Sequence, residues 1–273
     1  MKKKNESSEQ LNIQLFLLCM LAALLCRRLG KISSLRIICG MLRTMIYVGV
    51  YIGWGISIYK RVIQKSVRNV LIFIAELIIF WFVVRTTKYF FTMDNQMARY
   101  LWYSYYIPML FIPVAVLQAA FFLGKSEEYR LPKWLKGVYI PTAVLVLLVL
   151  SNDLHQLVFS FQVGSAWSDS HYTYGWGYYV VLVWEVVCAL TAFVLMIYKC
   201  RHSQKKKYLP LFGIGAAVLY AVLFISGVAW VQEIGGDITA VLCLLFVGIL
   251  ESCVRCGLIQ TNTGYDQLFE VCT

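Results

Sequence analysis

The stretch SNDLHQLVFSF, residues 151–161, gathers polar and ionisable side chains at the end of an apolar run. That run begins at Val138, and a helix that stopped at Leu150 would be about 20 Å long, shorter than a membrane core of about 30 Å. We therefore expect the helix to continue through the polar residues. With about 100° between successive residues, five polar side chains then share one side: Ser151, Asn152, Asp153, His155 and Gln156. At this depth they should face the bundle interior or a water-filled cavity.

Glu185 lies within the next apolar run, about 10 Å below the outer membrane surface. A carboxylate at the bilayer centre costs about 2.5–3.5 kcal/mol, so Glu185 should have a partner, and His155 on the preceding helix is the natural one. Two interpretations follow: a hydrogen-bonded lock between two helices, or the floor of a ligand pocket open to the outside. The second makes five residues the candidate ligand-binding site: Asn152, Asp153, His155, Gln156 and Glu185.

Glu76 and Glu251 are two further carboxylates inside apolar runs. Glu251 precedes Arg255 by one helical turn, so the two side chains can pair on one helix face. Glu76 has no obvious partner in the sequence. Together with Glu185 these acids suggest the alternative of a small-solute or proton-coupled transporter. Against it, no internal repeat relates two halves of the chain, and no matching pair of broken helices marks a transport site.

Motifs for enzyme chemistry are missing from the sequence. It has no G-x-S-x-G nucleophile motif, no H-E-x-x-H and no glycine-rich phosphate loop. Cys253 and Cys256 form a C-x-x-C, but neither a second such pair nor a nearby histidine completes a zinc set. We therefore predict no catalytic residue, no metal and no cofactor. Disulfides are not expected, since no cysteine falls in a segment assigned to the outside.

The elements that must position these residues are membrane helices. Of the 273 residues 60% are hydrophobic and 14% charged, whereas soluble domains have about 45–50% and about 25%. The predicted fold is all-α, a polytopic integral membrane bundle of seven core helices. The seven apolar runs cover residues 44–59, 70–84, 101–123, 138–159, 178–198, 209–230 and 238–258.

The basic residues indicate how the bundle is oriented. Thirteen of the 25 Lys and Arg lie in three short loops, residues 60–68, 125–136 and 199–207. Such residues hold loops in the cytoplasm, so the net charge of +11 reflects membrane orientation and no nucleic acid partner is expected. The connection 160–177 contains no Lys or Arg and belongs outside, whereas 85–100 is also assigned outside despite three basic residues. The alternation places the C-terminus in the cytoplasm.

The N-terminal segment 1–43 fits this pattern less well. Its apolar run 11–26 has basic residues on both sides, and crossing the membrane would place the second basic group outside, against the positive-inside rule. An extra membrane helix, an interfacial segment and a region upstream of a start at Met41 are the alternatives. The segment is also similar to a signal peptide, although no small-residue cleavage site follows.

Aromatic residues gather at the start of two helices, in 102–106 and in HYTYGWGYY, residues 171–179. An interfacial aromatic belt explains both groups. The alternative is that 171–179 caps a pocket and stacks on a ligand. Pro108 and Pro113 lie inside one apolar run, and we expect them to kink that helix.

The sequence resembles the seven-transmembrane N-terminal sensor region of bacterial histidine kinases over about 44–269. The matching stretches are YIGWGISIYKRVIQKSVRNVL at 51–71, RYLWYSYYIPMLFIP at 99–113, YRLPKWLKGVYIP at 129–141, SNDLHQLVF at 151–159, YGWGYYVV at 174–181 and GDITAVLCLLFVGILESCVRCGLIQTNTGYDQLF at 236–269. The last stretch is the most specific.

This resemblance implies a sensor domain at 44–259 and a cytoplasmic connector at 260–273. In the family, the segment after Tyr-x-x-Leu-Phe commonly leads to a phospho-acceptor histidine domain and an ATP-binding kinase domain. The three histidines of this chain, His155, His171 and His202, lie in or beside the bundle. The implied output is therefore a shift of helix 238–258 that reaches a kinase through 260–269, with no phosphotransfer by this chain itself.

The expected setting is the bacterial cytoplasmic membrane. The implied partners are the lipid bilayer, an extracellular or membrane-borne ligand, a separate cytoplasmic kinase or response partner and, in a homodimer, a second copy. A membrane-assembly protein in which the polar stripe only packs helices is a third hypothesis, beside the sensor and the transporter.

Overall fold

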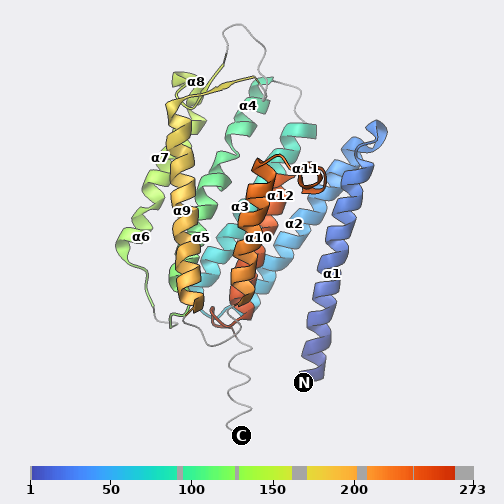
Figure 1. Ribbon diagram of the computed structural model, residues 1–273, viewed down its shortest axis with the longest axis vertical. Helices are drawn as coiled ribbons and strands as arrows, with labels where there is room; N and C mark the ends of the chain where they lie inside the picture. Colours follow the sequence, from blue (N-terminus) through green and yellow to red (C-terminus); the bar gives the residue numbers. More distant parts are fainter. Residues whose placement is uncertain are drawn as a thin grey trace. The chain divides into compact units, whose positions relative to one another are not determined.

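The computed structural model describes residues 2–90, 95–126, 129–161, 171–201, 208–235 and 237–261. They are almost entirely helical, as the all-α prediction required (Figure 1). The helices are α1 (Lys2–Leu29), α2 (Arg36–Arg61), α3 (Lys65–Phe90), α4 (Asn95–Tyr103), α5 (Tyr106–Phe122), α6 (Lys133–Gly137), α7 (Tyr139–Leu150), α8 (Asn152–His155), α9 (Trp176–Arg201), α10 (Tyr208–Ile225), α11 (Ala229–Gly235) and α12 (Ile238–Arg255). A short 3-10 helix (Ser33–Leu35) and two strands, β1 (Phe159–Ser160) and β2 (Thr173–Tyr174), complete them.

Seven helical stretches among the described residues are long and apolar enough to cross a membrane. They are Ser33–Arg61, Lys65–Phe90, Gln96–Phe122, Lys133–Leu150, Trp176–Cys200, Tyr208–Ile225 and Ile238–Arg255. Each overlaps one predicted run, so the chain is a multi-pass membrane protein. The run 11–26 lies in α1, and its crossing of the membrane stays a prediction.

The predicted continuation of the fourth helix through Asn152–Gln156 is wrong. α7 ends at Leu150, and the single turn α8 follows after Ser151. Gln156 takes a left-handed conformation with φ of 50° and ends that turn. The missing length lies at the other end, because the helical stretch begins at Lys133 and its 18 residues span about 27 Å. The lysines in this part of the sequence are typical of a loop. Their side chains are long, however, so the ammonium groups can reach the membrane interface from within a helix.

Two other breaks have local causes. α4 and α5 are separated at Ser104–Tyr105, one turn before Pro108. In a continuous helix the proline ring would clash with the carbonyl of Ser104, and proline has no N–H to donate to that carbonyl. The amide of Ile107 bonds that carbonyl instead, at 3.2 Å. The helix is thus interrupted just before Pro108, whereas α5 continues through Pro113, and the kinks themselves stay predictions. The sixth predicted run was too long, because α10 ends at Ile225 and Gly227 adopts φ of 74°, as in a helix C-cap.

The chain forms two compact units. Unit 1 comprises 1–57, 75–109 and 145–179, and unit 2 comprises 58–74, 110–144 and 180–273. The predicted domain limits at 43/44 and 259/260 stay predictions.

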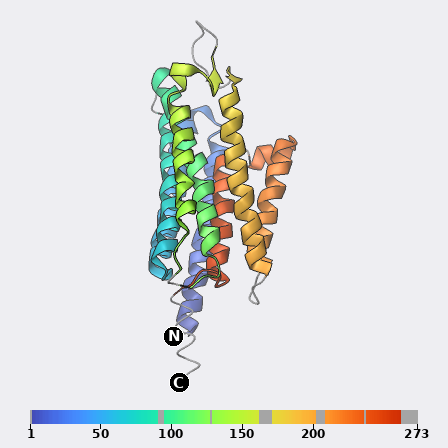
Figure 2. The ribbon, with the colours of Figure 1, turned by 90° about the vertical axis from the view of Figure 1, so that its left-hand side faces the viewer.

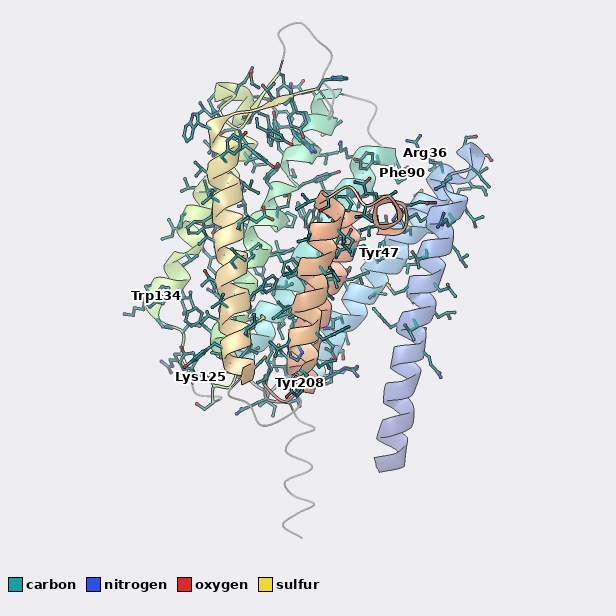
Figure 3. All side chains as sticks on the ribbon, viewed as in Figure 1. Arg36, Tyr47, Phe90, Lys125, Trp134 and Tyr208 are labelled. Atoms are coloured by element: carbon teal, nitrogen blue, oxygen red, sulfur yellow. The ribbon has the colours of Figure 1, made fainter. Side chains whose placement is uncertain are left out.

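In unit 1, α2 and α3 pack closely. Phe90, labelled in Figure 3, lies so near Gly40 that its ring would have to move to admit a Cβ at that position. Thr44 and Thr86 share a hydrogen bond of 2.7 Å, and Tyr47 packs on Phe82 with ring centroids 4.9 Å apart.

In unit 2, α10 and α12 lie side by side (Figure 1). Gly213 faces Ile249, where an added Cβ would lie 2.9 Å from the isoleucine side chain. Small residues at such a crossing let two membrane helices approach closely.

Candidate functional site

Asn152 is the centre of a tightly bonded corner in unit 1. Its side chain is fully buried. The amide oxygen accepts hydrogen bonds from the backbone N–H groups of Val158 and Phe159, both at 3.0 Å. The amide nitrogen donates to the Phe159 carbonyl at 2.8 Å and to the Tyr103 hydroxyl at 3.1 Å. These four bonds use the whole capacity of a side-chain amide, so Asn152 closes the turn that leads from α8 into β1.

Asp153 connects α8 to α4. One carboxylate oxygen lies 2.7 Å from the Arg99 guanidinium, and the other accepts a 2.7 Å hydrogen bond from Tyr103. Charged hydrogen bonds of this length are stronger than neutral ones. Arg99 had counted against the assignment of 85–100 to the outside. In the structure it is paired with an acid on another segment, and the assignment to the outside stays a prediction.

His155 is held within its own turn. Its Nδ1 accepts from the Leu157 amide at 3.0 Å, and its Nε2 lies 3.1 Å from the Leu148 carbonyl and 3.2 Å from the Ser151 hydroxyl. Because Nδ1 accepts, the ring proton is assigned to Nε2, which can donate to the Leu148 carbonyl. Both ring nitrogens are thus engaged inside unit 1.

Gln156 is exposed and its side-chain oxygen lies 3.4 Å from the Phe161 amide. The structure therefore brings four of the five candidate residues together in one corner: Asn152, Asp153, His155 and Gln156. The hydrogen bonds of their side chains join them to other residues of the same corner. A ligand contact by these residues remains a prediction.

Glu185 belongs to α9 in unit 2, with its side chain partly exposed. No hydrogen bond or ion pair joins it to another residue in the part of the chain that the structure describes. The neighbouring Trp184 donates to the Thr142 hydroxyl at 3.1 Å. The predicted pairing of Glu185 with His155 stays a prediction.

Phe159 occupies the middle of an aromatic cluster in unit 1. It is fully buried, and its ring contacts those of Trp102, Tyr103, Tyr106, Tyr172, Tyr174 and Tyr178. β1 and β2 pair antiparallel with Phe159 opposite Tyr174, next to α8 (Figure 2). The carbonyl of Leu157 leaves no room for a Cβ at Gly175. The stretch 171–179 thus covers the side chain of Phe159 in this structure.

Glu251 is the centre of an ion cluster in unit 2. Its two oxygens accept from the Arg61 guanidinium at 2.9 and 2.8 Å, and Arg255 adds a bond of 2.9 Å. The predicted pairing with Arg255 is confirmed. Arg61 was missed, since it lies on α2 and nothing in the local sequence distinguishes it from the other basic residues of 60–68.

The chain turns immediately after α12. Gly257 has φ of 71°, and the amide of Leu258 bonds the Cys253 carbonyl at 3.0 Å, the pattern of a Schellman cap. We call 258–261 the exit segment. Its Leu258 carbonyl accepts from the Gly124 amide at 2.8 Å, and its Gln260 carbonyl accepts from the Ile63 amide at 3.3 Å.

Two further contacts hold this end of unit 2 together. Thr261 forms an antiparallel bridge with Val62, so the exit segment runs beside the α2–α3 loop. Gln64 donates to the Ser126 carbonyl at 3.0 Å, which joins that loop to the segment that follows α5. The rest of the predicted connector, 262–273, lies outside the described residues.

A family model described as the N-terminal 7TM region of histidine kinase matches residues 15–254. Neither curated proteins nor solved structures gave a match. The matched range covers well over half of the chain, and the family is the seven-transmembrane sensor region, not a catalytic domain. The chain therefore belongs to the family of N-terminal seven-transmembrane regions of histidine kinases.

Proposed function

We propose that this chain is the membrane-embedded input module of a two-component histidine kinase. It detects a stimulus near the outer face, around Asn152, Asp153, His155, Gln156 and Glu185. A displacement of α12 then carries the signal to a cytoplasmic kinase. Phosphotransfer belongs to that kinase.

The observation that carries this proposal is the attachment of the exit segment. α12 is joined to α2 through Glu251 and Arg61, and the residues just after α12 bond to the loops at 62–64 and 124. A shift of α12 would strain these bonds first, because they are made by the C-terminal end of α12 and by the residues that follow it. Signals in such proteins pass through elements with discrete packed arrangements.

The proposed location is the bacterial cytoplasmic membrane with the C-terminus in the cytoplasm. The three basic loops support this orientation. A green fluorescent protein fused after Thr273 should fluoresce, and alkaline phosphatase at the same place should be inactive. The reverse result would invert the topology and remove the outer-face site.

The relay can be tested in a chimera. Residues 1–269 are joined in frame to the kinase module of a characterised sensor kinase, and autophosphorylation is measured in inverted membrane vesicles. We expect Arg61→Gln to change the basal rate and Arg255→Gln to leave it nearly unaltered. If Arg61→Gln loosens the exit segment but leaves the autophosphorylation rate unchanged, this relay is ruled out.

The same chimera tests the outer site. Glu185→Gln removes the titratable carboxyl group at nearly constant shape and should alter either the kinase rate or the thermal stability of the bundle. If neither quantity moves, Glu185 has no part in the proposed pocket.

The transporter remains the alternative. Two arginines neutralise Glu251, which makes it a poor proton carrier, whereas Glu185 lacks a partner among the described residues. Proteoliposomes under an imposed pH gradient distinguish the two functions. Solute uptake or proton flux that Glu185→Gln abolishes would establish transport.

A further inference from the structure

Two lysines come together at the C-terminal end of α5, within unit 2. α5 ends at Phe122, so its last carbonyl groups have no partners inside the helix. Lys199, in the last turn of α9, donates to one of them, the Phe121 carbonyl, at 2.6 Å. Lys125 follows α5 directly, and its ammonium group is near enough to that of Lys199 for the two to repel each other. Two positive charges therefore share this end of unit 2.

No acid neutralises these two charges in the part of the chain that the structure describes. No carboxylate there forms an ion pair with either ammonium group. The Phe121 carbonyl is uncharged and uses only one of the three N–H donors of Lys199. The Lys125 side chain is exposed and lies over the Tyr129 ring, 5.2 Å from its centroid. Two adjacent ammonium groups of this kind favour an anion that accepts hydrogen bonds from both.

The side chains around the lysines are those of a membrane interface. Trp134 of α6 is edge-on to Phe121, with ring centroids 5.8 Å apart; it is 64% exposed and projects from the side of unit 2 (Figure 3). Further along the same membrane-spanning stretch, Ile140 and Val144 lie one turn apart and are 69% and 58% exposed. Tryptophan favours the headgroup level, and exposed aliphatic side chains on a spanning helix contact lipid tails. A molecule with an anionic head and apolar tails therefore matches these surroundings better than a soluble anion does.

We propose that Lys125, Lys199 and Trp134 bind the headgroup of an anionic phospholipid, with phosphate oxygens accepting hydrogen bonds from both ammonium groups. The phosphate of a zwitterionic phospholipid is accompanied by the lipid's own cation, which the two lysines repel. The favoured ligand is therefore a phospholipid without an amine in its headgroup, such as phosphatidylglycerol. Basic pockets between membrane helices suit such lipids. The inference depends neither on the sensor function nor on the orientation of the chain.

Native mass spectrometry of the full chain in detergent measures this binding. Phosphatidylglycerol and phosphatidylcholine are titrated separately, and we expect phosphatidylglycerol to bind more tightly. Lys125→Gln and Lys199→Gln should each weaken its binding about fivefold, and the double variant about thirtyfold, the effect of one and of two lysines at a membrane surface. Lys65→Gln, which changes an exposed lysine at the start of α3 in the same unit, is the matched control and should change the affinity less than about twofold.

Three results would overturn the proposal. They are equal affinities for the two lipids, an unchanged affinity in the double variant, and a loss with Lys65→Gln as large as that with Lys125→Gln. Displacement of phosphatidylglycerol by an equal concentration of inorganic phosphate would assign the lysines to a soluble anion instead. Lys125→Gln keeps the bond between Lys199 and Phe121, so weaker binding by this variant at an unchanged melting temperature does not come from misfolding.

Tryptophan fluorescence in vesicles is the second test. The signal of Trp134 is the difference between the parent chain and Trp134→Phe. Phosphatidylcholine vesicles contain a small fraction of a lipid with brominated tails, either phosphatidylglycerol or phosphatidylcholine. We expect brominated phosphatidylglycerol to quench Trp134 more strongly, and Lys125→Gln to remove this difference. Equal quenching by the two brominated lipids in the parent chain would show that Trp134 selects no headgroup, and the proposal would be wrong.

Discussion

Replacing Arg61 with glutamine should release the exit segment from the α2–α3 loop. The native guanidinium makes two bonds to Glu251, at 2.9 and 2.8 Å, with 28% and 18% of the side chains exposed. Exposed ion pairs contribute about 0–1 kcal/mol, and breaking a fully buried pair costs about 3–5 kcal/mol. For this partly buried, bidentate pair we expect a loss of about 2 kcal/mol, close to a thirtyfold change in an equilibrium constant.

Hydrogen exchange measures this loss directly. The amides of Ile63 and Gly124 donate to carbonyls of the exit segment, so each exchanges when the segment detaches. In lipid nanodiscs, Arg61→Gln should raise exchange at both amides about thirtyfold. Arg61→Lys keeps the charge but loses the two-pronged geometry and should fall in between.

Arg255→Gln is the matched control. Arg255 makes one bond to Glu251 within the same helix and is 39% exposed, so its loss should cost about 0.3–0.5 kcal/mol. Exchange at the two amides should rise no more than about twofold. If Arg255→Gln matched Arg61→Gln, or if Arg61→Gln changed neither amide, the Arg61–Glu251 pair would not be what holds the exit segment.

Two further pairs of substitutions, each with a matched control, test unit 1 by thermal unfolding in detergent. Asn152→Ala leaves buried backbone groups of the α8 turn without partners and should cost about 3 kcal/mol or more, whereas Gln156→Ala at an exposed position should change stability by less than about 0.5 kcal/mol. Gly40→Ala places a methyl group against Phe90 and should destabilise by about 1–3 kcal/mol. Gly49→Ala, with nothing within 4 Å, should be neutral or stabilising by up to about 1 kcal/mol. Equal melting temperatures within either pair would contradict the packing described for that position.

The corner at α8 shows where sequence reasoning was insufficient. Hydropathy and length predict a helix that continues through Ser151–Gln156 only if Val138 is its first residue. The actual stretch begins at Lys133, and the span is complete by Leu150. Asn152 then bonds three backbone groups of Val158 and Phe159 and the Tyr103 hydroxyl. Such competition between side chain and backbone is not detected by periodicity.

The sequence by itself determined the seven membrane helices. In lipid each apolar run must satisfy its backbone hydrogen bonds internally, so length and hydrophobicity alone lead to a helix. It also determined contacts within one or two turns, such as Glu251 with Arg255 and the break before Pro108, since helix geometry sets which neighbours meet.

Only the tertiary structure decided which distant residues became partners. Arg61 and Glu251 are 190 positions apart, and Tyr103 and Asp153 are 50 apart. Several basic or hydroxyl side chains could have met each acid equally well on local grounds. The choice follows from helix packing, because the depth and rotation of each helix determine which side chains come within hydrogen-bond distance.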